Sequence, residues 1–211
     1  MSFGRGRNRV TLNYDPINQR WNNKDGNAYT GSTNKFAENL LADLKKNQEN
    51  MLGNFMVLNL SLDKKEHNII QGDVNDNKHD LAEIFYNGPE SSNDKILEGG
   101  NAYYAEGYVV LGHEMAHKFS KNLGIKNYFW FVDEGGNRGV DEYNAMYYEN
   151  ILRKENGLKL RMYYDYHPSD GFRGQIIDSQ RKLWPMPNDL LSQHKSLPLF
   201  HALIFFLGFK N

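Results

Sequence analysis

The stretch Val109–Phe119, VVLGHEMAHKF, decides the fold class and the chemistry expected of this chain. It contains His113, Glu114 and His117 in the spacing HExxH. Positions i and i+4 of a helix lie on one face, about one turn apart, so two imidazoles placed there can bind the same metal ion. The apolar residues on both sides of the motif are typical of a helix that is partly buried. A surface helix with two solvated histidines is the alternative, and these apolar flanks disfavour it.

The motif also predicts a type of chemistry. Zinc binds imidazole nitrogen well, and a catalytic zinc site keeps one position open for water. Glu114 directly follows the first histidine, where a carboxylate can take a proton from that water. A complete site of this kind needs a third protein ligand and a group that stabilises the transition state. We therefore expect both to come from the chain after His117.

Composition limits the classes of function. The chain has 211 residues, which suits one domain spanning residues 1–211, and we expect residues 1–8 to be disordered. Its formal net charge of −1 implies no broad attraction to nucleic acid or to an anionic membrane. The absence of cysteine excludes disulfides and thiolate metal ligands.

Neither end of the chain resembles a classical targeting or membrane-spanning segment. The first ten residues, MSFGRGRNRV, lack the apolar core of a signal peptide. The run LPLFHALIFFLGF at residues 197–209 is too short to span a bilayer and is interrupted by His201. We expect this run to be a buried core element, and a membrane-seeking tail is the alternative.

Periodicity along the chain predicts an α+β architecture, with a small sheet packed on the HExxH helix. The expected helices cover residues 33–50 (with Thr33 as the cap), 102–122 (ended by Gly124) and 140–156 (ended by Gly157), and the expected strands cover residues 9–14, 55–62, 68–72 and 96–97. Strands 55–62 and 68–72 are expected to form a hairpin, with 68–72 at the sheet edge, where it can align an extended substrate. Residues 87–95 and 133–139 are expected to be turns or loops.

The third metal ligand is expected from the second helix. Glu142 lies in the first turn of that helix, and Glu149 lies two turns further on the same face. We prefer Glu142 as the ligand and keep Glu149 as the alternative, because the second carboxylate can orient a ligand or an arginine. In a third possibility, both carboxylates pair with Arg153 and Lys154 on a solvated helix.

The stabiliser of the transition state is expected just after the second helix. Peptide hydrolysis builds a negative oxygen on the tetrahedral carbon, and a cationic or phenolic donor often stabilises it. Arg161 and Tyr164 are three residues apart and can reach into one cleft. The alternative for this pair is a surface cation and a core tyrosine.

Two segments carry a family resemblance. LGHEMAHKF followed by DEYNAMYYENILRKENGLKLRMYY, within Leu111–Tyr164, resembles the NleD-like effector metallopeptidases, including toxin domains at the C-termini of bacterial Rhs-type polymorphic toxins. The shared elements are the HExxH helix, an acidic pair at Asp141-Glu142, Glu149-Asn150 followed by Arg153, Gly157-Leu158, and an Arg-x-x-Tyr motif. The order of these elements is also similar to clostridial neurotoxin light chains. In those, the arginine and the tyrosine stabilise the transition state.

The resemblance implies a zincin-like metallopeptidase with one zinc ion. His113, His117 and Glu142 would bind the zinc, Glu114 would be the general base, and Arg161 and Tyr164 would stabilise the oxyanion. The family further implies an endopeptidase that is secreted, or translocated into a recipient cell by a non-classical route, as an effector or toxin that cuts proteins there. An immunity protein is then expected as a partner. The alternative functions are a non-toxin zinc peptidase or amidohydrolase and a non-catalytic, zinc-stabilised binding module.

Overall fold

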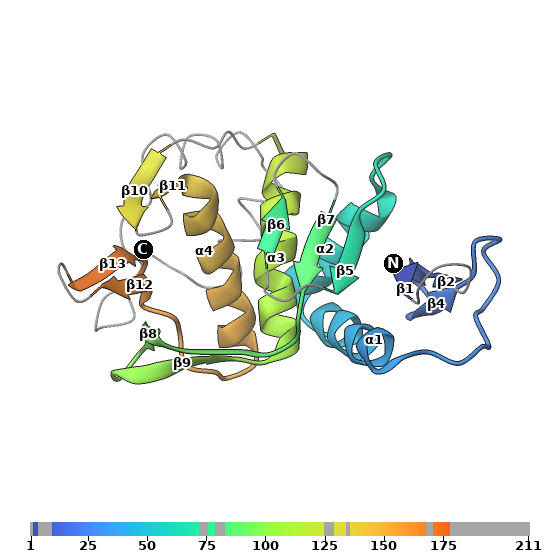
Figure 1. Cartoon of the computed structure of the whole chain (residues 1–211), viewed down its shortest axis with the longest axis horizontal. Helices are drawn as coiled ribbons and strands as arrows, with labels where there is room; N and C mark the ends of the chain where they lie inside the picture. Colours follow the sequence, from blue (N-terminus) through green and yellow to red (C-terminus); the bar gives the residue numbers. More distant parts are fainter. Residues whose placement is uncertain are drawn as a thin grey trace. The chain divides into compact units, whose positions relative to one another are not determined.

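The computed structural model describes residues 2–3, 10–71, 76–78, 83–124, 129–133, 136–167 and 171–177. Within these residues the protein is an α+β structure of helices and small sheets (Figure 1). The chain divides into two compact units. Unit 1 contains Met1–Pro89 and Ala105–Phe119, and unit 2 contains Glu90–Tyr104 and Ser120–Asn211. The expectation of a single domain stays a prediction.

Unit 1 is built from helices and short strands. Its helices are α1 (Lys35–Gln48), α2 (Met51–Leu62) and the larger part of α3 (Gly107–Asn122). Its strands are β1 (Ser2–Phe3), β2 (Val10–Thr11), β3 (Asn13–Asp15), β4 (Arg20–Asn22), β5 (Asn68–Gln71), β6 (Asp76–Lys78) and β7 (Glu83–Tyr86). Strands β1 and β2 pair antiparallel, as do β3 and β4. The remaining three form a mixed sheet in the order β5-β7-β6, in which β5 runs parallel to β7 and β6 antiparallel to it.

Unit 2 contains helix α4 and three strand pairs. The helix is α4 (Val140–Glu155), and the strands are β8 (Glu90–Leu97), β9 (Asn101–Ala105, in unit 2 up to Tyr104), β10 (Phe129–Asp133), β11 (Gly136–Gly139), β12 (Tyr163–His167) and β13 (Gly171–Gln175). They pair as β8-β9, β10-β11 and β12-β13. Strands β8 and β9 form a long hairpin in Figure 1. A backbone hydrogen bond from Glu98 N to Leu160 O (2.8 Å) joins the turn of this hairpin to the segment after α4.

The three predicted helices are present, with shifted ends. Helix α1 is capped by Asn34, whose side-chain oxygen accepts a hydrogen bond from Ala37 N (2.9 Å), and not by the expected Thr33. Helix α3 begins at Gly107, because residues expected in its first turns form strand β9. At their other ends, α3 and α4 are followed by Gly124 and Gly157, as expected, with φ of +72° and +67°.

The strand predicted at residues 55–62 is wrong, since this segment lies in helix α2. Its buried residues Leu52, Met56, Val57 and Leu60 follow the spacing of one helix face. Other apolar residues lie on the opposite face, where Leu62 is 81% exposed. Because the segment is apolar on all sides, its composition hides the helical period. The predicted hairpin of 55–62 with 68–72 is therefore also wrong, and β5 pairs with β7.

Two predicted loops are strands. Most of residues 87–95 lies in β8, and residues 136–139 of the expected loop 133–139 form β11. Both strands pair with a neighbour in the chain, so hairpin formation outweighs their turn-like composition. The strand predicted at 9–14 is interrupted at Leu12, which separates β2 from β3.

The apolar run at 197–209 and most of residues 1–8 lie outside the described residues, so those expectations stay untested. In the described part of the chain, no helix has the length and apolar character needed to cross a membrane.

Candidate metal centre

The start of helix α3 is held in place by side chains from α1 and β7. Asp43 accepts hydrogen bonds from the Tyr86 hydroxyl and from the backbone N–H of Tyr108. Asn47 donates to the carbonyl of Tyr108 (2.8 Å). Asp43 thus satisfies one of the backbone N–H groups that a helix leaves without a partner at its beginning. These contacts fix the first turn of the helix that carries the HExxH motif.

Gly107 makes this arrangement possible. A Cβ atom at this position would overlap the Tyr86 hydroxyl and the Asp43 carboxylate. The helix can therefore approach both side chains closely only because residue 107 lacks a side chain. Burial raises the pKa of the Asp43 carboxyl, although its hydrogen bonds from Tyr86 and Tyr108 act in the opposite direction.

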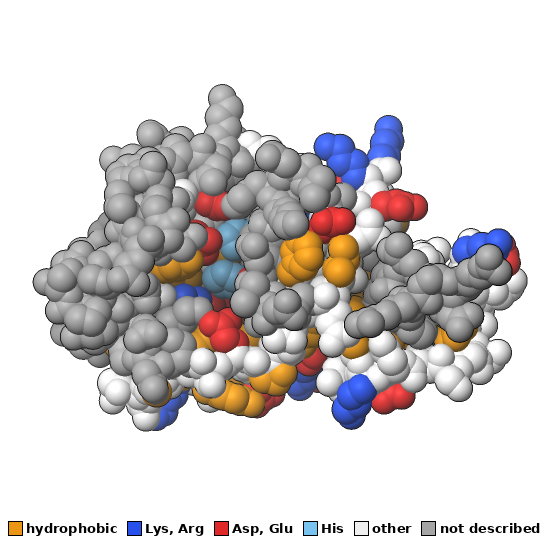
Figure 2. Space-filling view, viewed as in Figure 1, with side chains coloured by type: hydrophobic (Ala, Val, Ile, Leu, Met, Phe, Trp, Pro, Cys, Tyr) orange, Lys and Arg blue, Asp and Glu red, His pale blue; other side chains and the backbone are white. Residues whose placement is uncertain are grey.

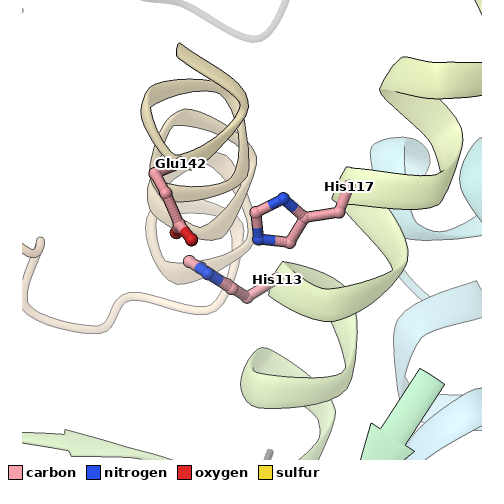
Figure 3. A group of neighbouring side chains, drawn as sticks. All are labelled: His113, His117 and Glu142. Atoms are coloured by element: carbon pink, nitrogen blue, oxygen red, sulfur yellow. The ribbon is translucent and has the colours of Figure 1, made fainter. Parts of the chain in front are cut away.

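The structure brings three of the predicted site residues together. His113, His117 and Glu142 each offer one ligand atom, and these atoms all lie within 4.8 Å of one another. The two imidazole rings have centroids 5.2 Å apart. Figure 3 shows the histidines on α3 and the glutamate on α4, with the three side chains pointing toward one another. Among the residues that the structure describes, no other group of three His, Asp or Glu side chains is close enough to bind one ion.

The burial of these side chains suits a site that substrate can reach. His117 is only 5% exposed, whereas His113 and Glu142 are partly exposed. Glu114, the expected general base, is 7% exposed. In the space-filling view, histidine side chains are visible on one face of the molecule, next to acidic side chains (Figure 2).

The donor set fits a divalent transition metal. Two imidazole nitrogens and one carboxylate oxygen match the ligands of one class of catalytic zinc site, which leaves a further position open. Imidazole also binds copper, iron and nickel, so the donor atoms indicate a metal class and do not by themselves identify zinc. Helix geometry adds support, because Glu142 lies in the first turn of α4, where the helix dipole favours a negative charge.

Glu149, the alternative ligand, has other partners. Its carboxylate is fully buried and forms ion pairs with two arginines, Arg153 Nε (2.7 Å) and Arg161 Nη1 (2.9 Å). Both of its oxygens are engaged, one by each arginine. The possible ion pair between Glu149 and Arg153 is present, but the expected solvated setting is wrong because both side chains are buried.

Arg161 is the centre of this buried cluster. Besides its bond to Glu149, its guanidinium donates to the carbonyls of Tyr163 (3.1 Å) and Tyr164 (2.8 Å). Burial acts to lower the pKa of Arg161, but the Glu149 carboxylate and the nearby Tyr103 and Tyr164 act in the opposite direction and together raise it. Its guanidinium carbon lies 5.4 Å from the centre of the Tyr164 ring. The catalytic roles expected of Arg161 and Tyr164 stay predictions, while their proximity is now observed.

Asn150 is a structural residue whose role the sequence did not reveal. Its side-chain oxygen accepts from Arg161 N (2.7 Å), and its side-chain nitrogen donates to Arg161 O (2.8 Å). This reciprocal pair ties α4 to the segment that leads into β12. The only sequence signal for the cluster is the i, i+4 spacing of Glu149 and Arg153.

Comparisons with protein-family models, with curated proteins and with solved structures each found no match to this chain.

Proposed function

We propose that this protein is a zinc-dependent endopeptidase whose metal ion is bound by His113, His117 and Glu142. The observation that supports this most strongly is the convergence of those three ligand atoms within 4.8 Å. Glu142 stands far from the histidines in sequence, so chance proximity of neighbours does not explain the group. The fixed position of Glu114 next to His113 adds the base that hydrolysis requires.

A zinc ion held there would lower the pKa of a bound water to about 7 and polarise the carbonyl of the scissile peptide bond. Glu114 accepts the proton that leaves the attacking water. The same carboxyl then donates this proton to the amine nitrogen of the leaving group, so one residue both accepts the proton and returns it.

Tyr164 and Arg161 are the proposed stabilisers of the oxyanion. Tyr164 is partly exposed whereas Arg161 is only 2% exposed, and this difference supports the tyrosine as the residue that contacts the substrate. The bonds from Arg161 to the Tyr163 and Tyr164 carbonyls support a positioning role for the arginine, with the phenol as the direct donor.

The biological role is proposed on the family resemblance alone. An effector or toxin that is secreted or translocated would cut proteins of a recipient cell, and a cognate immunity protein would protect the producer. A housekeeping peptidase or amidohydrolase with the same zinc chemistry differs from this proposal in its substrates and not in its metal ligands.

The test compares Glu114→Gln with the wild-type chain, both loaded with zinc. Each protein is incubated with lysate of a recipient cell, and new protein N-termini are identified by mass spectrometry. We expect Glu114→Gln to keep the fold and the zinc and to lose at least a hundredfold in cleavage rate, about the usual size of a general-base effect. Glu155→Gln, an exposed change at the end of α4, is the matched control.

Normal cleavage by Glu114→Gln would contradict the proposed mechanism. If the wild-type chain binds zinc yet cleaves nothing in any lysate, and His113→Ala abolishes folding, the non-catalytic module replaces the peptidase.

A further inference from the structure

Unit 1 contains a cavity of about 360 Å³ that the metal centre does not use. Its lining combines polar and charged residues with a group of buried apolar side chains, namely Leu44, Val57, Leu60, Ile84 and Met115. The cavity volume lies at the lower end of the range for small-ligand sites, and it accommodates at least one large apolar side chain.

The cavity lies behind the HExxH helix. Met115 is two residues from His113 and two from His117, which places it about 200° around the helix from each of them. Its side chain therefore lies on the face of α3 opposite to the imidazoles. A ligand in the cavity would contact the catalytic helix without occupying the metal centre.

Two outer strands contribute to the cavity wall. Asn13 and Tyr14 come from β3, and Asn68 and Ile69 come from β5. In the described part of the chain, β3 pairs only with β4 and β5 only with β7. Strand β1 approaches β5, but the two do not pair. Strand edges of this kind offer N–H and C=O groups to an extended peptide, and an adjacent pocket then selects its side chains.

Charged residues line the rim. Lys64, Lys65 and Glu66 are exposed, and Asp63 is engaged by His67 through a contact of 2.7 Å between Oδ2 and Nε2. The Asp63 carboxylate also accepts from the backbone N–H of Lys65 (3.2 Å), which fixes the turn that carries both lysines. The formal charges of Lys64 and Lys65 are matched by those of Asp63 and Glu66, so the rim carries charges of both signs. The two exposed ammonium groups can each pair with an acidic residue beside the apolar one.

We propose that this cavity is an exosite for an extended segment of the protein substrate. A large apolar side chain of that segment fills the interior, its backbone pairs with a strand edge, and an acidic neighbour lies at Lys64 and Lys65. The identity of the occupant as substrate rests on the proposed peptidase function. Binding of a peptide at the cavity does not require the metal, so the two proposals can fail separately.

The test uses the full-length Glu114→Gln protein, because this variant is expected not to cleave an added peptide. Its methionine methyl groups are labelled with ¹³C. The Met115 methyl signal reports on the cavity interior. The probes are acetyl-Thr-Glu-Leu-Glu-Thr-amide and the same peptide with glycine in place of leucine. We expect the leucine peptide to shift the Met115 signal and the glycine peptide to bind at least tenfold more weakly.

Two variants locate the binding. Val57→Phe fills the interior and should abolish the shift. The double variant Lys64→Glu/Lys65→Glu changes only exposed side chains, so it keeps the test decisive if Val57→Phe does not fold, and it should weaken binding at least threefold. Lys24→Glu, at another exposed lysine, is the matched control and should bind as the parent does.

Several results would overturn the exosite. The first is a Met115 signal that neither peptide shifts, and the second is equal binding of the leucine and glycine peptides. The third is binding of N-acetyl-leucine amide as tightly as the leucine peptide, because that would indicate a small-molecule site. In the active enzyme, Lys64→Glu/Lys65→Glu should raise KM for a protein substrate and leave kcat/KM unchanged for a short peptide around its cleavage site. Absence of any wild-type cleavage would refute the peptidase and leave the peptide-binding result standing.

Discussion

Replacing Glu149 by glutamine tests whether this residue stabilises the fold or binds the metal. The change leaves Arg153 and Arg161 without their shared anionic partner, at exposures of 1% and 2%. Breaking a buried ion pair by removing one partner costs about 3–5 kcal/mol, because a charge is left buried and uncompensated.

The structure places the expected loss at the lower end of that range. The arginines keep hydrogen bonds to backbone carbonyls, and both guanidinium carbons lie about 5 Å from the centre of the Tyr103 ring. The glutamine oxygen can also keep one of the two bonds that the carboxylate accepts. We therefore expect Glu149→Gln to lose about 3 kcal/mol in the free energy of unfolding, or roughly 6–12 °C in Tm for a chain of this size.

The assay is urea unfolding of the metal-free protein, followed by zinc titration. Glu142→Gln is the matched control, since it makes the same chemical change two turns earlier on the same helix. It should unfold within about 1 kcal/mol of the wild type and lose zinc affinity, whereas Glu149→Gln should still bind zinc. A Glu149→Gln protein that is as stable as the wild type, or that loses zinc while Glu142→Gln retains it, would refute this reasoning.

Three further changes test the helix start and the chemistry. Gly107→Ala should destabilise the protein by about 1–2 kcal/mol in urea unfolding despite the better helix propensity of alanine, and Tyr86→Phe in the same chain should recover part of that loss. Burial raises the pKa of Asp43, so the fold is stabilised at low pH by the protonated carboxyl and loses this contribution as the pH rises through the raised pKa. In unfolding measurements at pH 4 and pH 7, the wild type should therefore lose stability relative to Asp43→Asn. An equal pH dependence of the two proteins would contradict this. Tyr164→Phe should lower kcat about a hundredfold with unchanged zinc content, and an unchanged kcat would remove the phenol from the mechanism.

The sequence was most informative where local signals agree. The HExxH motif and the glycines Gly124 and Gly157 predict helices α3 and α4 and the ends of both, whereas the start of α3 lies five residues later than expected. The strand prediction for residues 55–62 is wrong because the apolar residues of α2 surround the whole helix and leave no period that distinguishes a helix from a strand. Its true state depends on packing against residues far away in the chain.

The choice between two carboxylates required three-dimensional information. Glu142 and Glu149 share one helix face, so spacing alone made both of them candidates. They differ in their neighbours, because Arg161 reaches Glu149 only after the chain turns at Gly157 and returns along α4. Likewise, the contacts of Asp43 and Tyr86 with the start of α3 join the three elements α1, β7 and α3. A local sequence pattern cannot predict contacts between residues so far apart in the chain.

X-ray absorption at the zinc edge tests the central claim most directly. We expect one zinc per chain, bound by two imidazole nitrogens at about 2.0–2.1 Å and by carboxylate or water oxygens, with the carboxylate contribution lost in Glu142→Gln. Failure of the wild-type chain to bind zinc, or a zinc spectrum that His113→Ala and Glu142→Gln leave unchanged, would contradict the account.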